Sequence, residues 1–264
     1  MQLSTLLLSA LSATVVYGAP SFPDLNLGAA SPDGIETMTE YFTMLAAKVQ
    51  QSRLMSAAPV CDLSKAVMPE APVPLPAVSK GLTLKHVAIG RGTQNYTCDL
   101  KNATAVPVAN GALATLFNAS CIVATYPDLA KMLGRVSLRF SLTQSEASRK
   151  LAPSNLIISG KHFFTNATTP FFTLDSSPEQ QLGEVPCAKE AGTPAPADAP
   201  VGQKGEAAVP WLKLKARVGA TGDLQEVYRV ETVGGSAPAD CKGMPAAFEV
   251  EYATQYVDAC NYRP

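Results

Sequence analysis

Alternating apolar and polar residues predict β-strands in most of the chain after residue 81. Between residues 136 and 143, apolar side chains alternate with polar ones, as in a half-buried strand, at Val136, Leu138, Phe140 and Leu142. Strand-like alternation or composition recurs at residues 82–89, 94–100, 111–120, 156–164, 170–175, 211–218, 226–233 and 248–257. The pattern predicts a mainly β fold, a single-domain β-sandwich or barrel of about nine strands.

Helical spacing is clearest near the N-terminus. Between residues 31 and 55, apolar side chains recur every three to four positions, at Ile35, Met38, Phe42, Leu45, Ala46 and Val49. Ser31 or Asp33 can cap the start of this amphipathic helix. We expect the helix to cover one sheet face; the alternative is a detachable helix that binds a partner. Residues 126–134 form the one internal stretch with a helical pattern.

The segments before and between the strands suggest an exported protein with one β-domain. Residues 1–18 are typical of a signal peptide, because an apolar run is followed by small Gly18 and Ala19. Residues 19–80 then hold the N-terminal helix and a proline-rich connector, whose prolines keep residues 69–78 extended. Residues 81–264 form the β-domain, in which residues 191–205 are a surface loop. We predict a secreted, extracellular protein, either free or associated with the cell wall.

Charge and cysteine content narrow the classes of partner. The net charge is −1 and only 16% of residues are charged, which disfavours nucleic acid and anionic lipid as partners. No segment is long and apolar enough to span a membrane.

Six cysteines fit a disulfide framework better than metal thiolates. Because Cys98 and Cys121 end neighbouring strand-like segments, we expect a hairpin to join them in a disulfide.

Four glycosylation sequons follow the predicted signal peptide. They begin at Asn95, Asn102, Asn118 and Asn166. Behind a signal peptide, such sites predict N-glycans on a solvent face and passage through a eukaryotic secretory route. The alternative is that these residues are ordinary polar turn residues.

The stretch Gly90–Cys98 is either a corner or a ligand-binding loop. Gly90 and Gly92 bracket Arg91, and glycines at this spacing favour a bulge or tight bend. The alternative is a loop that presents Arg91 to an anionic or planar ligand. Strand parity after the glycines directs Asn95 outward and Tyr96 inward.

Few residues form a recognisable catalytic pattern. The two histidines, His86 and His162, cannot build a three-histidine metal site, so we expect no metal. His86 is expected to be a buried, hydrogen-bonded residue, and His162 is the better candidate for a ligand contact. Serine-nucleophile motifs are absent from the sequence, and no two of its acidic residues stand out as a pair for glycoside hydrolysis.

Two adjacent phenylalanine pairs flank the sequon at Asn166. Residues 161–172 are predicted to form a hairpin, and neighbouring strand residues point to opposite faces. One phenylalanine of each pair must therefore lie outside the core. Either the N-terminal helix covers these rings, or Phe164 and Phe171 offer an aromatic shelf that stacks on sugar rings.

Five blocks of the chain stand out as longer motifs, namely HVAIGRGTQNYTCDL, GALATLFNASC, GKHFFTNATTPFFTLD, VPWLKLKA and VYRVETVGGSAPADC. These blocks resemble fungal members of the domain of unknown function 3455 family. The resemblance covers residues 59–256 and implies a secreted, β-rich protein without a characterised activity. Cys187 and the tail after Tyr256 depart from the family pattern, which suggests the pairs Cys187–Cys260 and Cys61–Cys241.

Some members of that family carry a malate dehydrogenase label, which this sequence does not support. A nicotinamide site needs a third glycine and a helix after Gly90 and Gly92, whereas this chain continues into a strand. We therefore predict no cofactor and no dehydrogenase activity. The function we expect is binding of an extracellular ligand, a cell-wall glycan or a host surface protein. The alternatives are an extracellular hydrolase of polysaccharide or ester and a structural cell-wall protein.

Overall fold

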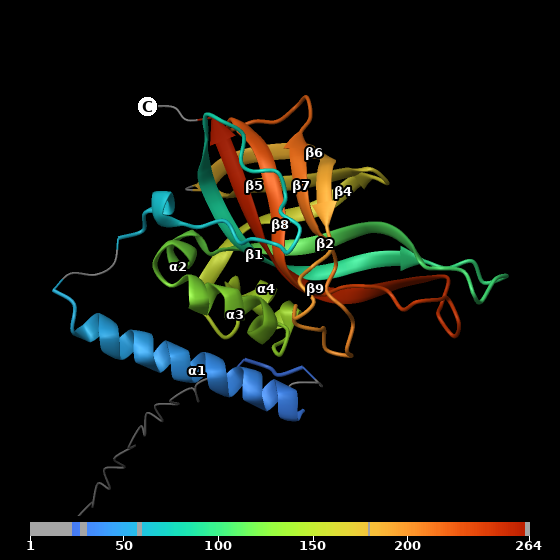
Figure 1. The fold of residues 1–264 in the computed structure, drawn as a ribbon, viewed down its shortest axis with the longest axis horizontal. Helices are drawn as coiled ribbons and strands as arrows, with labels where there is room; N and C mark the ends of the chain where they lie inside the picture. Colours follow the sequence, from blue (N-terminus) through green and yellow to red (C-terminus); the bar gives the residue numbers. More distant parts are fainter. Residues whose placement is uncertain (1–22, 27–30, 57–59, 179, 262–264) are drawn as a thin grey trace, which may run out of the picture.

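A closed antiparallel barrel forms the centre of the molecule (Figure 1). The computed structural model describes residues 23–26, 31–56, 60–178 and 180–261, so the predicted signal peptide lies outside the described residues. Eight strands follow one another in the order β2-β1-β9-β8-β7-β6-β5-β4, and pairing of β2 with β4 closes the ring. The strands are β1 (Leu82–Thr97), β2 (Val108–Asn118), β4 (Leu156–Asn166), β5 (Thr169–Ser177), β6 (Gln180–Thr193), β7 (Trp211–Ala216), β8 (Leu224–Gly234) and β9 (Ala247–Asn261). The short β3 (Lys150–Leu151) pairs with β4 alone. The mainly β prediction is confirmed, with a barrel as the architecture.

Alternation along the strands produces two cores. Side chains that point into the barrel form one cluster, which includes Leu116, Phe172, Val185, Tyr252 and Tyr256. Side chains that point outward on one side, including Val87, Ile89 and Phe117, pack against helices in a second cluster. Strands β1 and β9 are buried along nearly their whole length, because one face of each points into the barrel and the other packs in the outer cluster.

Three short helices cover this outer side. They are α2 (Ser120–Thr125), α3 (Pro127–Ser137) and α4 (Leu142–Ser148). The internal helix predicted at 126–134 is confirmed. The strand predicted at 136–143 is wrong, because Val136 continues the buried helical face of Leu129 and Leu133. Ser141 then caps α4 by accepting a hydrogen bond from Gln144 N at 3.2 Å. An alternation of only four apolar positions, over residues 136–143, fits a helix end followed by a turn as well as it fits a strand.

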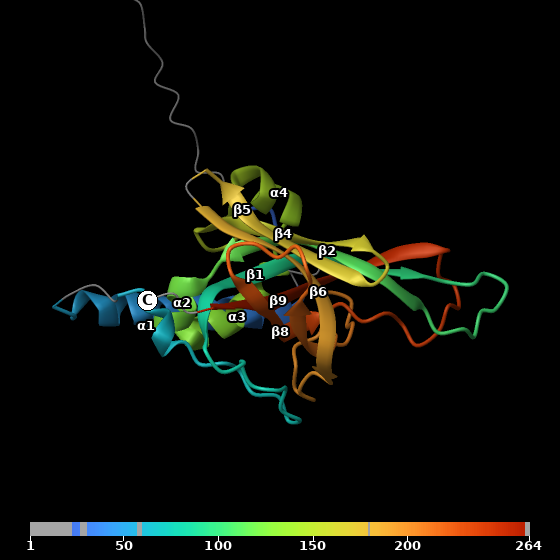
Figure 2. The same cartoon turned by 90° about the horizontal axis from the view of Figure 1, so that it is seen from above.

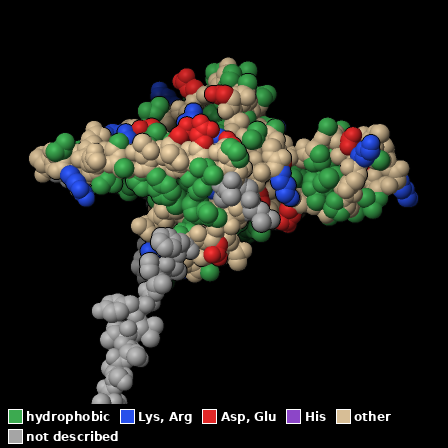
Figure 3. All heavy atoms as spheres, turned by 90° about the horizontal axis from the view of Figure 1, so that it is seen from below, with side chains coloured by type: hydrophobic (Ala, Val, Ile, Leu, Met, Phe, Trp, Pro, Cys, Tyr) green, Lys and Arg blue, Asp and Glu red, His purple; other side chains and the backbone are tan. Residues whose placement is uncertain are grey.

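The N-terminal helix α1 (Pro32–Arg53) exists, with Ser31 as its cap. It packs on α3, which lies between it and the barrel, so the expectation that it covers a sheet face is wrong (Figure 1). Its buried residues are Gly34, Thr37 and Tyr41, one position away from the predicted stripe. Ile35, Phe42 and Val49 are consequently exposed, and Figure 3 shows hydrophobic side chains gathered on this side of the molecule.

Strand β1 runs without interruption through Gly90, Arg91 and Gly92. All three residues pair with both β2 and β9, so the predicted corner is wrong. The two glycines instead allow strand β2 and the Tyr256 ring to approach the backbone of β1 closely. A Cβ at Gly92 would lie 1.8 Å from the Leu113 carbonyl oxygen, and one at Gly90 would lie 2.6 Å from the Tyr256 ring.

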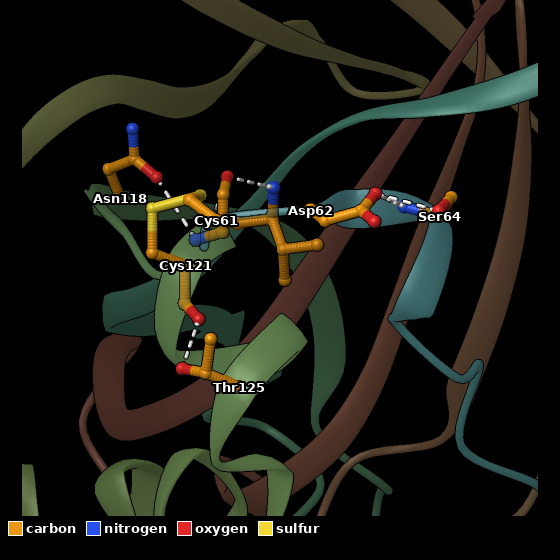
Figure 4. The surroundings of a disulfide bond; sticks show 8 residues. Cys61, Asp62, Ser64, Asn118, Cys121 and Thr125 are labelled. Carbon is orange, nitrogen blue, oxygen red and sulfur yellow. Dashed lines mark hydrogen bonds between the residues drawn. A yellow bond between two sulfur atoms is a disulfide. The ribbon is translucent and has the colours of Figure 1, made fainter. Parts of the chain in front are cut away.

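Two disulfides are present, and the predicted pairings are wrong. Cys61 bonds to Cys121 (Figure 4), and Cys98 bonds to Cys241. The hairpin of β1 and β2 does form, but Thr97 lies opposite Val108 and Ala88 opposite Asn118. Cys98 and Cys121 are therefore at opposite ends of the hairpin, roughly 30 Å apart at about 3.3 Å per residue. Cys187 and Cys260 are both free, so the predicted bond between them is also absent.

The proline-rich connector forms neither helix nor strand, and it bends at Pro72 and Val73, so it is not extended throughout as predicted. It follows the 3-10 helix η2 (Leu63–Lys65) and lies against Trp211, Tyr228 and Val230 on the outer side of β7 and β8. Proline lacks the N–H that a ladder requires, so the segment lies on the barrel without adding a strand. Among the described residues, none of the helices has the length and apolar character needed to cross a membrane.

Candidate functional site

Arg91 lies in strand β1 and not in a loop, and its side chain does not face a ligand site. Its side chain is 1% exposed and donates hydrogen bonds to the carbonyl oxygens of Ser137 and Phe140. The guanidinium also lies 3.1 Å from the Glu251 carboxylate. Burial lowers the pKa of Arg91 to about 10 and the Glu251 charge opposes that shift, so the group stays charged at neutral pH. Arg91 links the α3–α4 turn to the barrel wall through these hydrogen bonds. The prediction that it contacts a ligand is therefore wrong.

His162 is also unsuited to contact a ligand at the surface. The imidazole is 3% exposed inside the barrel and stacks on Phe172 with ring centroids 4.2 Å apart. Its Nδ1 lies 3.0 Å from the Phe171 carbonyl oxygen. Burial lowers the pKa of His162 to about 3, so the ring is uncharged at neutral pH.

His86 belongs to a buried hydrogen-bond chain. Its Nδ1 lies 2.9 Å from Asp258 Oδ2, and its Nε2 lies 3.0 Å from Ser159 Oγ. Ser159 is the extra residue of a bulge in β4, since Gly160 and Ile158 pair with consecutive residues of β2. The order of contacts is that of a serine-hydrolase triad. All three side chains are at most 1% exposed, so a substrate cannot reach Ser159 Oγ while the barrel stays closed.

The phenylalanine pairs divide between the two faces of the β4–β5 hairpin. Phe172 fills the barrel interior opposite His162. Phe163 and Phe171 are direct cross-strand partners on the outer face, half-buried, with ring centroids 5.2 Å apart and a tilt of 41°. Phe164 lies on the other face, 5.7 Å from the His162 ring. The outer pair is therefore Phe163 with Phe171, and the predicted combination of Phe164 with Phe171 is wrong.

A polar cleft of about 400 Å³ lies next to this pair. Its lining comes from β2, β4, β5 and the end of α4, which Figure 2 shows beside β4 and β5; the residues are Thr115, Glu146, Arg149, Ile158, Gly160, Lys161, Thr173, Asp175 and Ser176. Lys161 is paired with Thr173 in the ladder, one same-face step from the Phe163–Phe171 pair. That step is about 7 Å along the strand.

The cleft combines donors and acceptors. Arg149 and Lys161 form no ion pair within the described part of the chain, whereas Glu146 accepts a hydrogen bond from Thr115 Oγ1. Asp175 Oδ1 accepts a hydrogen bond from Gly183 N at 2.7 Å, and its other oxygen has no hydrogen-bond partner among the described residues. Ser176 Oγ is buried without a hydrogen-bond partner among the described residues. Two cations and two carboxylates balance in charge, which suits an uncharged ligand rich in hydroxyl groups.

The sequons differ in exposure. Asn102 and Asn166 are exposed, and Asn95 and Asn118 are half-buried. Asn118 also accepts a hydrogen bond from Ser120 N at 3.0 Å beside the Cys61–Cys121 bond (Figure 4). In the described part of the chain, no three His, Cys, Asp or Glu side chains are grouped to hold a metal ion.

Sequence reasoning missed most of the cleft. The parity rule places Lys161 with Phe163 and Phe171 with Thr173 on one face, so this half could have been found. Glu146 and Arg149 follow the segment that the alternation pattern assigned to a strand, and no sequence signal connected them to β4.

A comparison with known families agrees with the resemblance of the sequence blocks. Residues 78–257 match the family described as protein of unknown function (DUF3455). The chain belongs to the DUF3455 family. The match covers the whole of β1 to β8 and most of β9, and thus the barrel and the cleft of this DUF3455 protein. No curated protein and no solved structure matches the chain.

Proposed function

We propose that this protein is a carbohydrate-binding protein that holds a neutral oligosaccharide on the outer face of β4 and β5. The observation that carries the proposal is the in-register Phe163–Phe171 pair beside the cleft of Glu146, Arg149, Lys161 and Asp175. Sugar rings have an apolar face that stacks on aromatic rings and hydroxyl groups that both donate and accept hydrogen bonds. The aromatic pair lies one same-face step along the ladder from Lys161 and Thr173 of the cleft, so the two kinds of contact are neighbours.

Export of the protein is part of the same proposal. Two disulfides are consistent with an oxidising compartment, to which the predicted signal peptide would direct the chain and in which the sequons would be glycosylated. A fungal source and a cell-wall glycan as the ligand follow from the sequence resemblance and remain predictions. A host surface protein as partner and a structural role in the wall remain the other predictions of this class.

Calorimetric titration with laminarihexaose, cellohexaose and chitohexaose tests the binding proposal. We expect saturable heat with at least one of them. Replacing Phe171→Ala should weaken that binding about tenfold, because a lost stacking contact of roughly 1.4 kcal/mol corresponds to this factor. Phe163→Ala should have a similar effect.

Phe42→Ala is the matched control, since it removes an exposed ring from α1 on another face of the molecule. It should leave the affinity unchanged. Absence of heat with all three sugars, or equal affinity of the wild type and Phe171→Ala, would refute the assignment of this face.

A glycoside hydrolase is the second candidate, because two carboxylates, Glu146 and Asp175, line the same cleft. Chromatography of the incubated hexaoses separates the two functions. Binding alone leaves the hexaoses intact, whereas hydrolysis releases shorter products that disappear in Glu146→Gln and Asp175→Asn. A Ser159 esterase is not proposed, because Ser159 is closed off from solvent.

A further inference from the structure

Helix α1 has a row of apolar side chains on the side that faces away from α3. Ile35, Phe42 and Val49 follow one another at intervals of seven residues, and their exposed fractions are 53%, 46% and 43%. Seven residues make about two turns of an α-helix, so the three side chains lie in one line, as in the seam of a coiled coil. Figure 3 shows hydrophobic side chains gathered on this side of the molecule.

The surface around this row has only one wall. The residues that line it all belong to α1; they are Ile35, Met38, Thr39, Phe42, Thr43, Ala46, Ala47 and Gln50. In the described part of the chain, no second element closes over them. Apolar side chains that stay in contact with water lose the free energy that burial would supply. A second helix laid along the row would supply the missing wall.

The helix cannot turn its row inward, because its opposite side is fixed to α3. Tyr41 is 2% exposed on that side. Near the start of α1, Asp33 pairs with Arg135, and near its end Lys48 Nζ lies 2.8 Å from Asp128 Oδ2. A rotation of α1 that buried the row would break both ion pairs and expose Tyr41. The row is therefore a permanent feature of the surface.

Exposed charges along α1 change sign from one end to the other. Glu36 and Glu40 lie in its first half and Arg53 at its end, and all three are exposed. None of them forms an ion pair with another described residue, whereas Asp33 and Lys48 are paired with α3. Two copies of α1 packed antiparallel would bring opposite charges together, and parallel packing would bring like charges together.

Side-chain sizes along the row fit the same antiparallel arrangement. When two copies of α1 cross at the level of residue 44, Phe42 of each copy lies opposite Ala46 of the other. Arg53 then lies next to Glu36 of the other copy. A large side chain opposite a small one lets two helices interdigitate closely. One crossing point thus satisfies both the sizes and the charges.

We propose that the protein forms a twofold-symmetric homodimer in which the exposed faces of two α1 helices pack antiparallel. A twofold interface uses the same surface on both copies, so that surface has to complement itself, as the row of α1 does. One helix pair is smaller than a standard interface, and the dimer is accordingly a reversible one. The proposal does not rest on the sugar site, because β4 and β5 take no part in this contact.

Sedimentation equilibrium of the purified protein tests the dimer. Between about 1 and about 300 µM, the weight-average mass should rise from that of one chain toward that of two, as for a micromolar dissociation constant. Phe42→Glu places a charge at the centre of the interface and should weaken dimerisation at least about tenfold. Val218→Glu adds the same charge to the fully exposed loop between β7 and β8 and should dimerise like the wild type.

A charge exchange tests the antiparallel direction. Glu36→Arg alone and Arg53→Glu alone each bring like charges together, and each should weaken dimerisation about threefold or more. The double variant restores opposite charges and should dimerise like the wild type. Circular dichroism checks that every variant is folded. A single-chain mass at all concentrations, unchanged dimerisation of Phe42→Glu, or no recovery in the double variant would overturn the proposal; the first result would leave this face to a different protein.

Discussion

At the scale of single residues, the barrel interior holds polar groups that are kept uncharged or paired. Cys187 is buried there, and burial raises the pKa of its thiol to about 12, so it stays protonated. Tyr252 and Tyr256 share a hydrogen bond of 2.8 Å between their hydroxyls. His162 is uncharged and stacked on Phe172. These groups pack the interior, and none of them is reactive at neutral pH.

His162 makes stability depend on pH in a predictable direction. The pKa of the ring is about 3 in the folded protein against an ordinary value of 6.5, so below pH 6.5 the unfolded chain takes up a proton that the folded one excludes. Stability is therefore present above pH 6.5 and is lost as the pH falls toward 3. Between about pH 7.5 and about pH 5, this group alone should remove about 2 kcal/mol.

Urea unfolding of the wild type and His162→Gln at both pH values measures this contribution. Glutamine can still donate to the Phe171 carbonyl but does not titrate. Acidic groups titrate in both proteins and cancel in the comparison. If both proteins lost the same free energy of unfolding, His162 would have to be accessible to protons in the folded state.

At the scale of elements, the length of β1 depends on two glycines that let neighbouring parts approach closely. At Gly92 the obstacle to a side chain is backbone, the Leu113 carbonyl, which cannot move without breaking the β1–β2 ladder. At Gly90 the obstacle is the buried Tyr256 ring, a side chain whose displacement would not break the β1–β2 ladder. The two positions should therefore respond differently to the same substitution.

Gly92→Ala is expected to destabilise the protein by about 3 kcal/mol or more, since it forces apart a paired backbone. Gly90→Ala should cost less. Gly134→Ala in α3 is the control, because its Cβ would meet Val233 Cγ2 at an ordinary 3.4 Å and helix propensity favours alanine. Thermal unfolding followed by circular dichroism ranks the three, and a Gly92→Ala protein as stable as Gly134→Ala would contradict the packing argument.

At the scale of the whole molecule, the two disulfides link parts that are distant in sequence. Cys61–Cys121 joins the segment before the proline-rich connector to α2, and Cys98–Cys241 joins the end of β1 to the loop before β9. The second bond spans 143 residues and restricts the unfolded chain strongly. Removing it by Cys98→Ser with Cys241→Ser should cost about 2 to 5 kcal/mol.

Peptide mapping under non-reducing conditions checks the same connectivity. It should recover the Cys61–Cys121 and Cys98–Cys241 pairs. Iodoacetamide should alkylate the half-buried Cys260 first and Cys187 only after unfolding, since a buried, protonated thiol is unreactive. A peptide that joins Cys98 to Cys121 would instead support the hairpin bond that strand proximity suggested.

Part of the fold and part of the site could be predicted from the sequence. Most of the strands, the N-terminal helix with its Ser31 cap and the internal helix follow from periodicity, which acts within a few residues. The long strand β6 (Gln180–Thr193) was not predicted. Parity also separates Phe171 from Phe172 without any tertiary information. The segment 136–143 could not be assigned, because a short alternation is compatible with two local structures and its contacts with Arg91 and α1 decide between them.

The sequence by itself determined most of the strands, the helices at 32–53 and 127–137, and which residues of a strand share a face, because backbone geometry imposes those periods locally. Tertiary structure alone decided what lies opposite each face. Strand β1 continues through Gly90 and Gly92, and Cys98 is bonded to Cys241. His162 is buried in the barrel, and Glu146 and Arg149 lie next to β4. These outcomes depend on the register between strands distant in sequence and on the closure of the barrel by β2 and β4, and such contacts leave no periodic trace in the chain.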